Sequence, residues 1–252
     1  MTKKLLILLL TGFGFQAFAQ LETAADFKRQ VYDREYTLGI IGHSRGYAIN
    51  GRYLKFMDGF NKQGVEIDMT KLRHPKEVRT PNQFATGSRG YVFGRTNSFY
   101  SIRVGYAREN TLYDKTDQGT VSIALNYSGG ASLGLLKPIY LQVYEDTPLS
   151  PLDQIVTVRY NPREHNVSNI YGEANFFKGF GEMSLKPGVY AKLGVTFDFD
   201  LLDRKVTSLE VGTVYDLFFT EVPIFYEEDG TDINEVGFFQ LYLAINFGYK
   251  KN

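Results

Sequence analysis

His43 and Ser44 are the residues of this sequence whose types could form a nucleophile–base pair. On a strand, a histidine can take the proton of a serine when the two stand at positions i and i+2, because these positions share a face. Here the residues are adjacent and would point to opposite faces. Gly42 before them and Arg45-Gly46 after them indicate a turn that could restore the geometry. We favour a loop histidine beside a turn-forming serine.

A second candidate is a set of charged residues that alternate with apolar ones along the chain. Carboxylates held close together can do acid–base chemistry. Charges that face a filled interior must instead pair with one another, since an unpaired charge there costs several kcal/mol. We therefore expect a structural network in which Arg103 and Lys192 bridge the carboxylates. Its expected members are Glu66, Asp68, Arg103, Lys192, Asp198, Glu210 and Asp216.

The elements that must position these residues are strands. In the last segment, 239–249, apolar residues from Phe239 to Tyr249 occupy every second position, and polar or small residues such as Gln240 and Asn246 occupy the others. Strict alternation indicates a strand with one apolar and one polar face. The segment has about 11 residues, which suits a tilted strand that crosses a bilayer.

Nine segments show this pattern, and Gly90–Arg95 is our candidate for a tenth. Bacterial single-chain barrels normally have an even number of strands, with both ends in the periplasm. We therefore predict an all-β, antiparallel transmembrane β-barrel of ten strands, with eight as the alternative. The nine segments are 36–40, 47–50, 65–70, 100–106, 121–127, 131–144, 189–200, 207–219 and 239–249. Tight turns are predicted at 128–130 and 201–204 on the periplasmic side, and long extracellular loops at 72–89, 145–187 and 220–236.

A soluble sandwich or lipocalin would also alternate, with its apolar face inward. The membrane is favoured because tyrosine and phenylalanine gather at strand ends, as in an interfacial aromatic girdle. Residues 1–19 are predicted to be a cleaved signal peptide, with Lys3 and Lys4, an apolar run and the motif Ala17-Phe18-Ala19. Residues 20–35 are then a periplasmic lead-in, and 36–252 a single barrel domain in the bacterial outer membrane.

Composition narrows the functional classes. Lysine and arginine total 28, as do aspartate and glutamate, so the net charge is zero and nucleic acid is not an expected partner. The absence of cysteine excludes disulfides, a thiolate metal site, a cysteine nucleophile and a lipidated N-terminal cysteine. We expect no metal and no cofactor.

The signal, the hairpins and the aromatic final strand resemble outer-membrane β-barrel proteins of the Bacteroidota. The segments Leu72–Arg79, Tyr91–Asn97 and Leu133–Pro138 look like pieces of an uncharacterised barrel family of that phylum. The chain departs from the usual ending, because Lys250-Lys251-Asn252 follow the last aromatic residue. The resemblance implies location and fold, and it implies no reaction.

Two loop features could bind partners from the outside. Guanidinium groups bind phosphates well, so a basic loop could contact lipopolysaccharide, although an ordinary solvated loop is the interpretation we favour. The basic residues concerned are Arg73, Lys76, Arg79 and Arg89. In the long loop 145–187, exposed Phe176, Phe177 and Phe180 suggest a protein partner, with folding over the barrel mouth as the alternative.

Three functions follow from these features. The first, which we prefer, is a non-enzymatic barrel that serves as a structural or accessory subunit of an envelope complex for outer-membrane protein assembly or secretion. The second is a lipid-modifying enzyme, like a lipid A deacylase or phospholipase, that uses His43 and Ser44. The third is a small-solute porin, which is disfavoured because side chains nearly fill a barrel of eight to ten strands.

Overall fold

The computed structural model describes residues 32–80, 88–114, 121–145, 154–167, 169–199, 204–226 and 232–252. The predicted signal peptide, 1–19, lies outside these residues, as does most of the predicted lead-in, 20–35. The first strand already begins at Arg34, inside the predicted lead-in. In the described part of the chain, no helix has the length and apolar character needed to cross a membrane.

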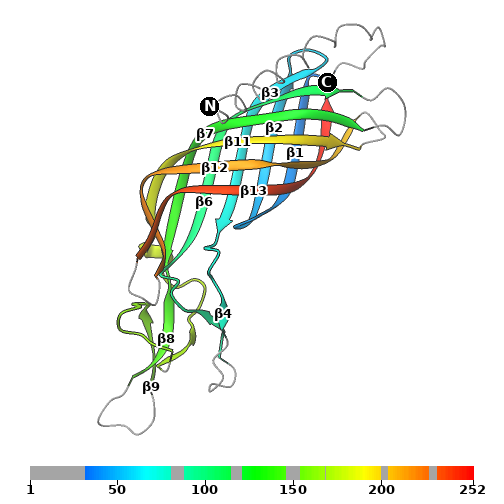
Figure 1. The fold of residues 1–252 in the computed structure, drawn as a ribbon. Coiled ribbons are helices and arrows are strands. Elements are labelled where there is room, and N and C mark those ends of the chain that lie inside the picture. The colour runs from blue at the N-terminus through cyan, green and yellow to red at the C-terminus, as the bar shows by residue number, and fades with distance from the viewer. Residues whose placement is uncertain are drawn as a thin grey trace, which may run out of the picture. The chain divides into compact units, whose positions relative to one another are not determined.

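Antiparallel strands close into a barrel (Figure 1). It has eight strands, and the first pairs with the last, so that Tyr36 lies opposite Tyr249. The predicted all-β antiparallel barrel is confirmed, with eight strands and not ten. The barrel strands are β1 (Arg34–His43), β2 (Gly46–Phe56), β3 (Asn61–Leu72), β6 (Asn97–Tyr113), β7 (Ser122–Pro138), β11 (Ser184–Asp198), β12 (Lys205–Tyr226) and β13 (Asp232–Lys251). Around the barrel the order is β1-β13-β12-β11-β7-β6-β3-β2.

The predicted turn at 128–130 is wrong, because the single strand β7 runs through it from Ser122 to Pro138. The end of the predicted strand 131–144 is not part of the barrel, since β8 (Tyr140–Glu145) belongs to a separate sheet. The alternation crosses the glycines in phase: Asn126 and Ser132 are buried, whereas Tyr127 and Ala131 are exposed. Gly130 pairs with Gly105 of β6, and a Cβ at Gly130 would lie 2.3 Å from the backbone oxygen of Val104. Small residues therefore serve close packing here, where the sequence pattern indicated a turn.

The predicted tenth strand, 90–95, is also wrong as a barrel element. Only Tyr91–Val92 form a strand, β5, and it pairs with the two-residue strand β4 (Arg79–Thr80) away from the barrel. Gly94 then has a left-handed φ of 82°, which ends the extended segment. The predicted long loop at 220–236 is mostly strand, since β12 continues to Tyr226 and β13 begins at Asp232.

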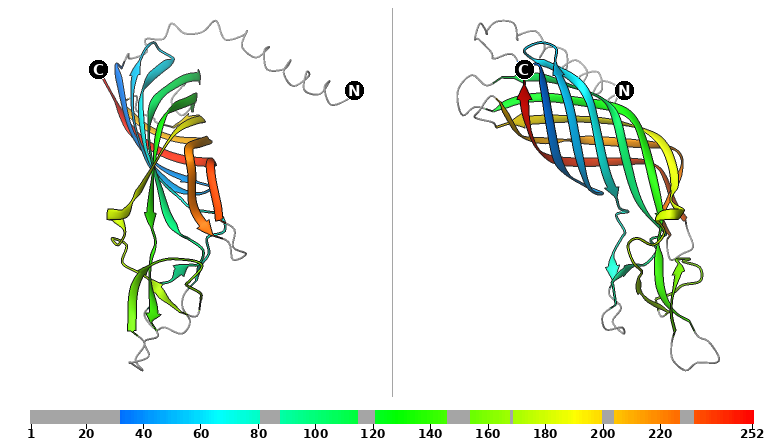
Figure 2. Two further views of the ribbon diagram at one scale, coloured as in Figure 1. Left: turned by 90° about the vertical axis from the view of Figure 1, so that its left-hand side faces the viewer. Right: turned by 180° about the vertical axis from the view of Figure 1, so that it is seen from behind.

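The two ends of the barrel carry different connections. At the terminal end, where Arg34 pairs with Lys251, β2 and β3 are joined by the short segment 57–60. At the opposite loop end, the long segments 73–96 and 139–183 leave the barrel (Figure 2). Long loops at the end opposite the termini are the arrangement found in outer-membrane barrels.

The described residues of these two segments form a small folded unit, which we call the loop module. It contains β4, β5 and a three-stranded sheet of β8 (Tyr140–Glu145), β9 (Gln154–Arg159) and β10 (Ile170–Glu173), followed by the 3₁₀ turn η1 (Phe180–Glu182). Backbone hydrogen bonds fix it to the barrel, from Thr96 to Ile224 (3.1 Å) and from Tyr226 to Gly94 (2.8 Å). Its own buried apolar cluster consists of Tyr91, Ile139, Leu141, Val143, Tyr160 and Ile170.

The outer surface of the barrel is an apolar belt. Outward positions of the described strands carry no charged side chain between a rim of lysines and arginines at the terminal end and Lys71, Lys137 and Glu221 at the loop end. Leu38, for example, is 69% exposed. Exposed members of the belt are Leu38, Ile40, Ile49, Ile67, Met69, Val104, Tyr106, Tyr127, Leu133, Leu185, Val189, Leu193, Val211, Leu217, Phe219, Phe239, Leu241, Leu243, Ile245, Phe247 and Tyr249.

Candidate functional site

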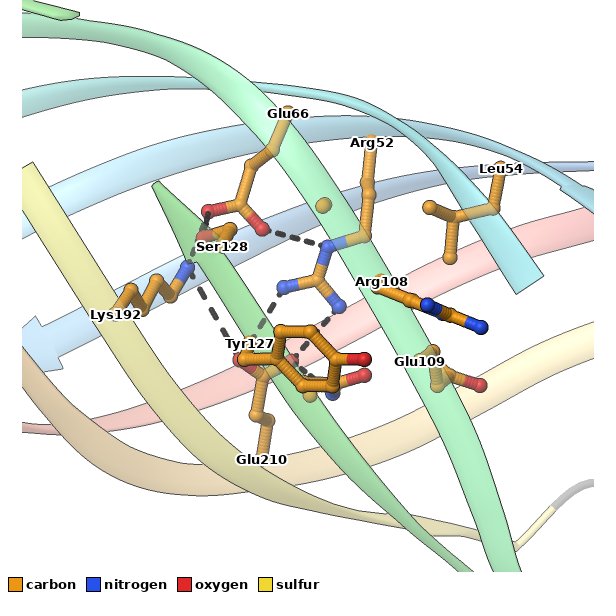
Figure 3. A pocket seen from close by; sticks show the side chains of 11 residues that line it. Arg52, Leu54, Glu66, Arg108, Glu109, Tyr127, Ser128, Lys192 and Glu210 are labelled. Carbon is orange, nitrogen blue, oxygen red and sulfur yellow. Dashed lines mark hydrogen bonds and ion pairs between the residues drawn. The ribbon is translucent and has the colours of Figure 1, made fainter. Parts of the chain in front are cut away.

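The interior of the barrel is polar at its centre. Arg52, on β2, donates from Nε to Glu66 on β3 (2.7 Å) and from both Nη atoms to Glu210 on β12 (3.0 and 3.2 Å). Lys192, on β11, donates to Glu66 over 2.9 Å and lies 3.5 Å from Asp68. These side chains come from β2, β3, β11 and β12, and Figure 3 shows how Arg52, Glu66, Lys192 and Glu210 point toward one another. Glu210 is fully buried.

The other half of this ion network lies beside the groups around Arg52 and Lys192. Arg103, on β6, donates to Asp216 on β12 with Nε at 2.7 Å, and its Nη1 lies 3.7 Å from Asp68. Gln240, on β13, donates to Asp216 over 2.8 Å and accepts from Arg103 over 3.2 Å. Asp68 therefore lies between the Lys192 and Arg103 halves, and the two halves form one network across the lumen.

Six of the seven predicted network residues meet in this network: Glu66, Asp68, Arg103, Lys192, Glu210 and Asp216. Asp198 does not reach it. That carboxylate lies near the terminal end, 3.8 Å from Lys250. Sequence reasoning missed Arg52, because the predicted strand stopped at 50. Continuing the alternation through outward Tyr53 would have placed Arg52 inside.

An apolar layer closes the lumen at the loop end. The rings of Phe99, Phe218 and Phe238 contact one another with centroids 5.2 to 5.7 Å apart. Gly134 makes room for them, since a Cβ there would lie 2.6 Å from the Phe99 ring. The layer as a whole consists of Leu72, Phe99, Leu136, Phe218, Val222, Ile224 and Phe238. Two interior cavities nearer the terminal end have volumes of only about 10 and 20 Å³, little more than one water each. Side chains of the described residues therefore fill most of the lumen.

The terminal end of the lumen has an ion cluster of its own. Lys62 donates to Glu35 over 2.8 Å and to Glu109 over 2.6 Å, linking β1, β3 and β6. All three side chains are largely buried. Together with the central network and the phenylalanine layer, this cluster fills the barrel along its length.

The structure does not bring His43 and Ser44 into a catalytic arrangement. His43 is the last residue of β1, and its Nδ1 accepts a hydrogen bond from the backbone of Arg45 over 3.3 Å. Its Nε2 is buried without a hydrogen-bond partner. Ser44 stands in the following two-residue turn, and its Oγ accepts from the backbone nitrogen of Leu241 over 3.3 Å. Each side chain is thus engaged with backbone, and no hydrogen bond between them is present among the described residues.

The basic residues predicted to contact lipopolysaccharide lie on the loop module and the adjoining rim. Arg79 is well exposed, donates to the Gly90 carbonyl over 3.1 Å and lies 3.6 Å from Glu173. Arg73, Lys76 and Arg89 are exposed as well.

Close by, His74 stacks on Phe225 with ring centroids 4.9 Å apart, and burial lowers the pKa of its imidazole. His74 is therefore a neutral packing group in this loop.

Phe176, Phe177 and Phe180 lie together between β10 and β11. Their rings contact one another with centroids 5.4 to 6.1 Å apart, and all three are exposed, Phe177 by 77%. Lys137 of β7 has its ammonium 4.7 Å from the Phe176 ring centroid, so the rings lie against the loop end of β7. The protein partner that these residues suggest, and the alternative of folding over the barrel mouth, both stay predictions.

The fold and the interior define a small, closed, eight-stranded antiparallel barrel with a largely filled lumen and a folded module on its long loops. No family model matches the chain, and no curated protein is similar to it at a significant level. Among solved structures, the chain is similar to the crystal structure of Neisserial surface protein A, with 8% identity over 86% of this chain and 94% of that chain. The TM-score is 0.34. A similarity at this level does not bear on function.

Proposed function

We propose that this chain is a non-enzymatic outer-membrane protein whose barrel crosses the bilayer and holds the loop module at the cell surface. One observation carries the proposal, the charge-free apolar belt around a barrel whose polar side chains point inward. A soluble barrel would bury its apolar face and expose its polar one. Transmembrane barrels carry the opposite arrangement, with an apolar band about 25 Å tall between aromatic girdles.

The largely filled lumen favours a role other than transport. The central ion network, the phenylalanine layer and the cluster around Lys62 leave no continuous path for a solute. A barrel that conducts nothing contributes its membrane anchorage and its loops. We therefore propose that it is a structural or accessory subunit of an envelope complex, with the loop module as the contact surface. Apolar residues exposed on the module include Val78, Ile155 and Val167.

Localisation is tested by fractionation and gel mobility. The full chain is expected in the outer-membrane fraction, delivered by the signal peptide that the sequence predicts at 1–19. Folded transmembrane barrels resist detergent, so the unboiled protein should migrate differently from the boiled one. Recovery in the aqueous fraction, with identical migration before and after boiling, would refute the proposal.

The accessory role is tested by affinity purification of the tagged full chain from detergent-solubilised membranes. We expect a stoichiometric partner that is lost when Val78 and Val167 are both changed to aspartate. Lys205→Asp, at the terminal end, is the matched control and should retain the partner.

Phosphate contacts by Arg73, Lys76, Arg79 and Arg89 belong to the same proposal, and their combined replacement by alanine should weaken binding of lipopolysaccharide. Discrete conductance steps in planar bilayers would instead favour the porin.

A further inference from the structure

We propose that Phe176, Phe177 and Phe180, here called the phenylalanine cluster, insert into the lipid interface beside the β7–β11 seam. The inference rests on the proposed function, because it needs the barrel to lie in a bilayer. It names a second membrane contact, made by the loop module in addition to the barrel wall. The geometry points to lipid through three observations, which concern the neighbours of the cluster, its exposure and its polar boundary.

The cluster lies on the outer side of the barrel wall. Leu136 points into the lumen, where it belongs to the apolar layer, so the next residue, Lys137, points outward in phase with Leu133 and Leu135. Yet Lys137 is only 4% exposed. Its ammonium lies 4.7 Å from the Phe176 ring centroid and 5.1 Å from that of Phe180. The phenylalanines therefore cover the outer end of β7.

The cluster also continues the apolar belt. The turn η1, which contains Phe180, leads within two residues to Ser184, the start of β11. Ser184 pairs with Leu136, and the next residue, Leu185, is a belt residue that is 60% exposed. The exposed rings and the outward row of β11 are thus joined without an intervening charged side chain other than Glu182.

Polar groups lie next to the cluster, at the start of β8. Lys178 lies with its ammonium 5.6 Å from the Tyr140 ring centroid, and Glu182 accepts a hydrogen bond from the Tyr140 hydroxyl over 2.5 Å. Aromatic residues next to charged and hydrogen-bonding groups occupy the membrane–water interface and not the bilayer centre. The expected depth of Phe177 is therefore shallow, at the level of the headgroups and the first acyl carbons.

This contact would fix the loop module on one side of the barrel. Segment 139–183 of the module connects β7 to β11. Lipid contact by the cluster would restrict the tilt of the module relative to the membrane. If the cluster were exposed to water or covered by a protein, only the connections to β7 and β11 would orient the module. The inference therefore concerns how the proposed partner surface is presented at the cell surface.

The sequence has no tryptophan, so a single substitution creates a unique fluorescent reporter. Full-length Phe177→Trp is reconstituted into phosphatidylcholine vesicles whose acyl chains carry bromine at shallow or deep positions. We expect blue-shifted emission, with stronger quenching by the shallow bromines than by the deep ones and little quenching by acrylamide. Val167→Trp, exposed on the loop module, is the aqueous control. Its emission should not be blue-shifted, and it should be quenched strongly by acrylamide and little by the bromines. Leu243→Trp, in the belt, should be quenched most by the deep bromines.

Each outcome has a distinct meaning. If Leu243→Trp is quenched by brominated lipid while Phe177→Trp behaves like Val167→Trp, the lipid contact is refuted and the barrel proposal survives. If Leu243→Trp is not quenched either, the proposed membrane location fails. Phe177→Trp that becomes protected only after addition of solubilised membrane proteins would identify a protein occupant and would also overturn the inference.

Discussion

Arg52 and Glu210 meet across the lumen from strands that are not neighbours in the barrel. The Arg52 Nη1 atom donates to Glu210 Oε2 over 3.0 Å, and both side chains are almost completely buried. Glu210 also accepts from Tyr242 over 2.6 Å and from Asn126 over 3.2 Å. A single carboxylate therefore ties β2, β7, β12 and β13 together inside the barrel.

Glu210→Gln should strongly destabilise the barrel. The substitution keeps the volume but leaves Arg52 and Lys192 with an incomplete set of counter-charges, and breaking a buried ion pair costs about 3–5 kcal/mol. The free energy of unfolding is measured by denaturant titration of the protein in lipid vesicles. Asp198→Asn is the matched control, since its partner Lys250 is 3.8 Å away near the rim, and it should cost about 0–1 kcal/mol. Equal effects of the two variants would contradict a central role for the network.

If the apolar belt faces lipid, a charged residue placed on it should lower the free energy of unfolding, and by more the nearer it lies to the bilayer centre. Leu243→Arg places a guanidinium near the middle of outward-facing β13 and should cost about 2–4 kcal/mol in a bilayer. Thr207→Arg faces outward close to the terminal rim, where the cost falls to about 0–1 kcal/mol. Unfolding in vesicles measures both. A Leu243→Arg variant as stable as Thr207→Arg would mean that the belt does not face lipid.

Gly130→Ala should impair folding although alanine adds only one methyl group. A Cβ at this position would lie 2.3 Å from the backbone oxygen of Val104 and 2.4 Å from the Cα of Gly105, and neither atom can rotate away. Overpacking of this kind costs about 1–3 kcal/mol. Gly42→Ala is the control, because nothing lies within 4 Å of a Cβ there. The yield of folded, heat-modifiable protein distinguishes the two, and a tolerant Gly130 would argue for a loop at this point of β7.

His43→Leu should leave the membrane lipids unchanged and the protein at least as stable. The Nε2 atom of His43 is buried without a partner, and removing such a group relieves a penalty of about 1–3 kcal/mol that the lost Nδ1 hydrogen bond offsets in part. Mass profiles of lipid A and phospholipids from cells with wild-type, His43→Leu and Ser44→Ala proteins test the enzyme hypothesis. A lipid species that disappears in both variants would establish catalysis.

The sequence by itself determined the fold class and most of the lumen network. Alternation of period two is a local property, so the strands around Phe239–Tyr249 and Val189–Phe197 could be recognised without any partner. The same alternation assigned Glu66, Arg103, Lys192 and Glu210 to one kind of face. Their pairing also followed, because charges in a filled interior must neutralise one another.

Only the tertiary structure decided the number of strands, the apolar layer that closes the loop end of the lumen, and the position of the phenylalanine cluster. Gly129 and Gly130 look like a turn until the backbones of Tyr190 and Gly105 are seen packed against them from neighbouring strands. Phe99, on β6, is far along the chain from Phe218 and Phe238, which lie on the consecutive strands β12 and β13, so no local pattern could reveal that Phe99 meets them. Local periodicity reports which face a side chain takes. Contacts across a closed barrel depend on the register of strands, which is set by all eight together.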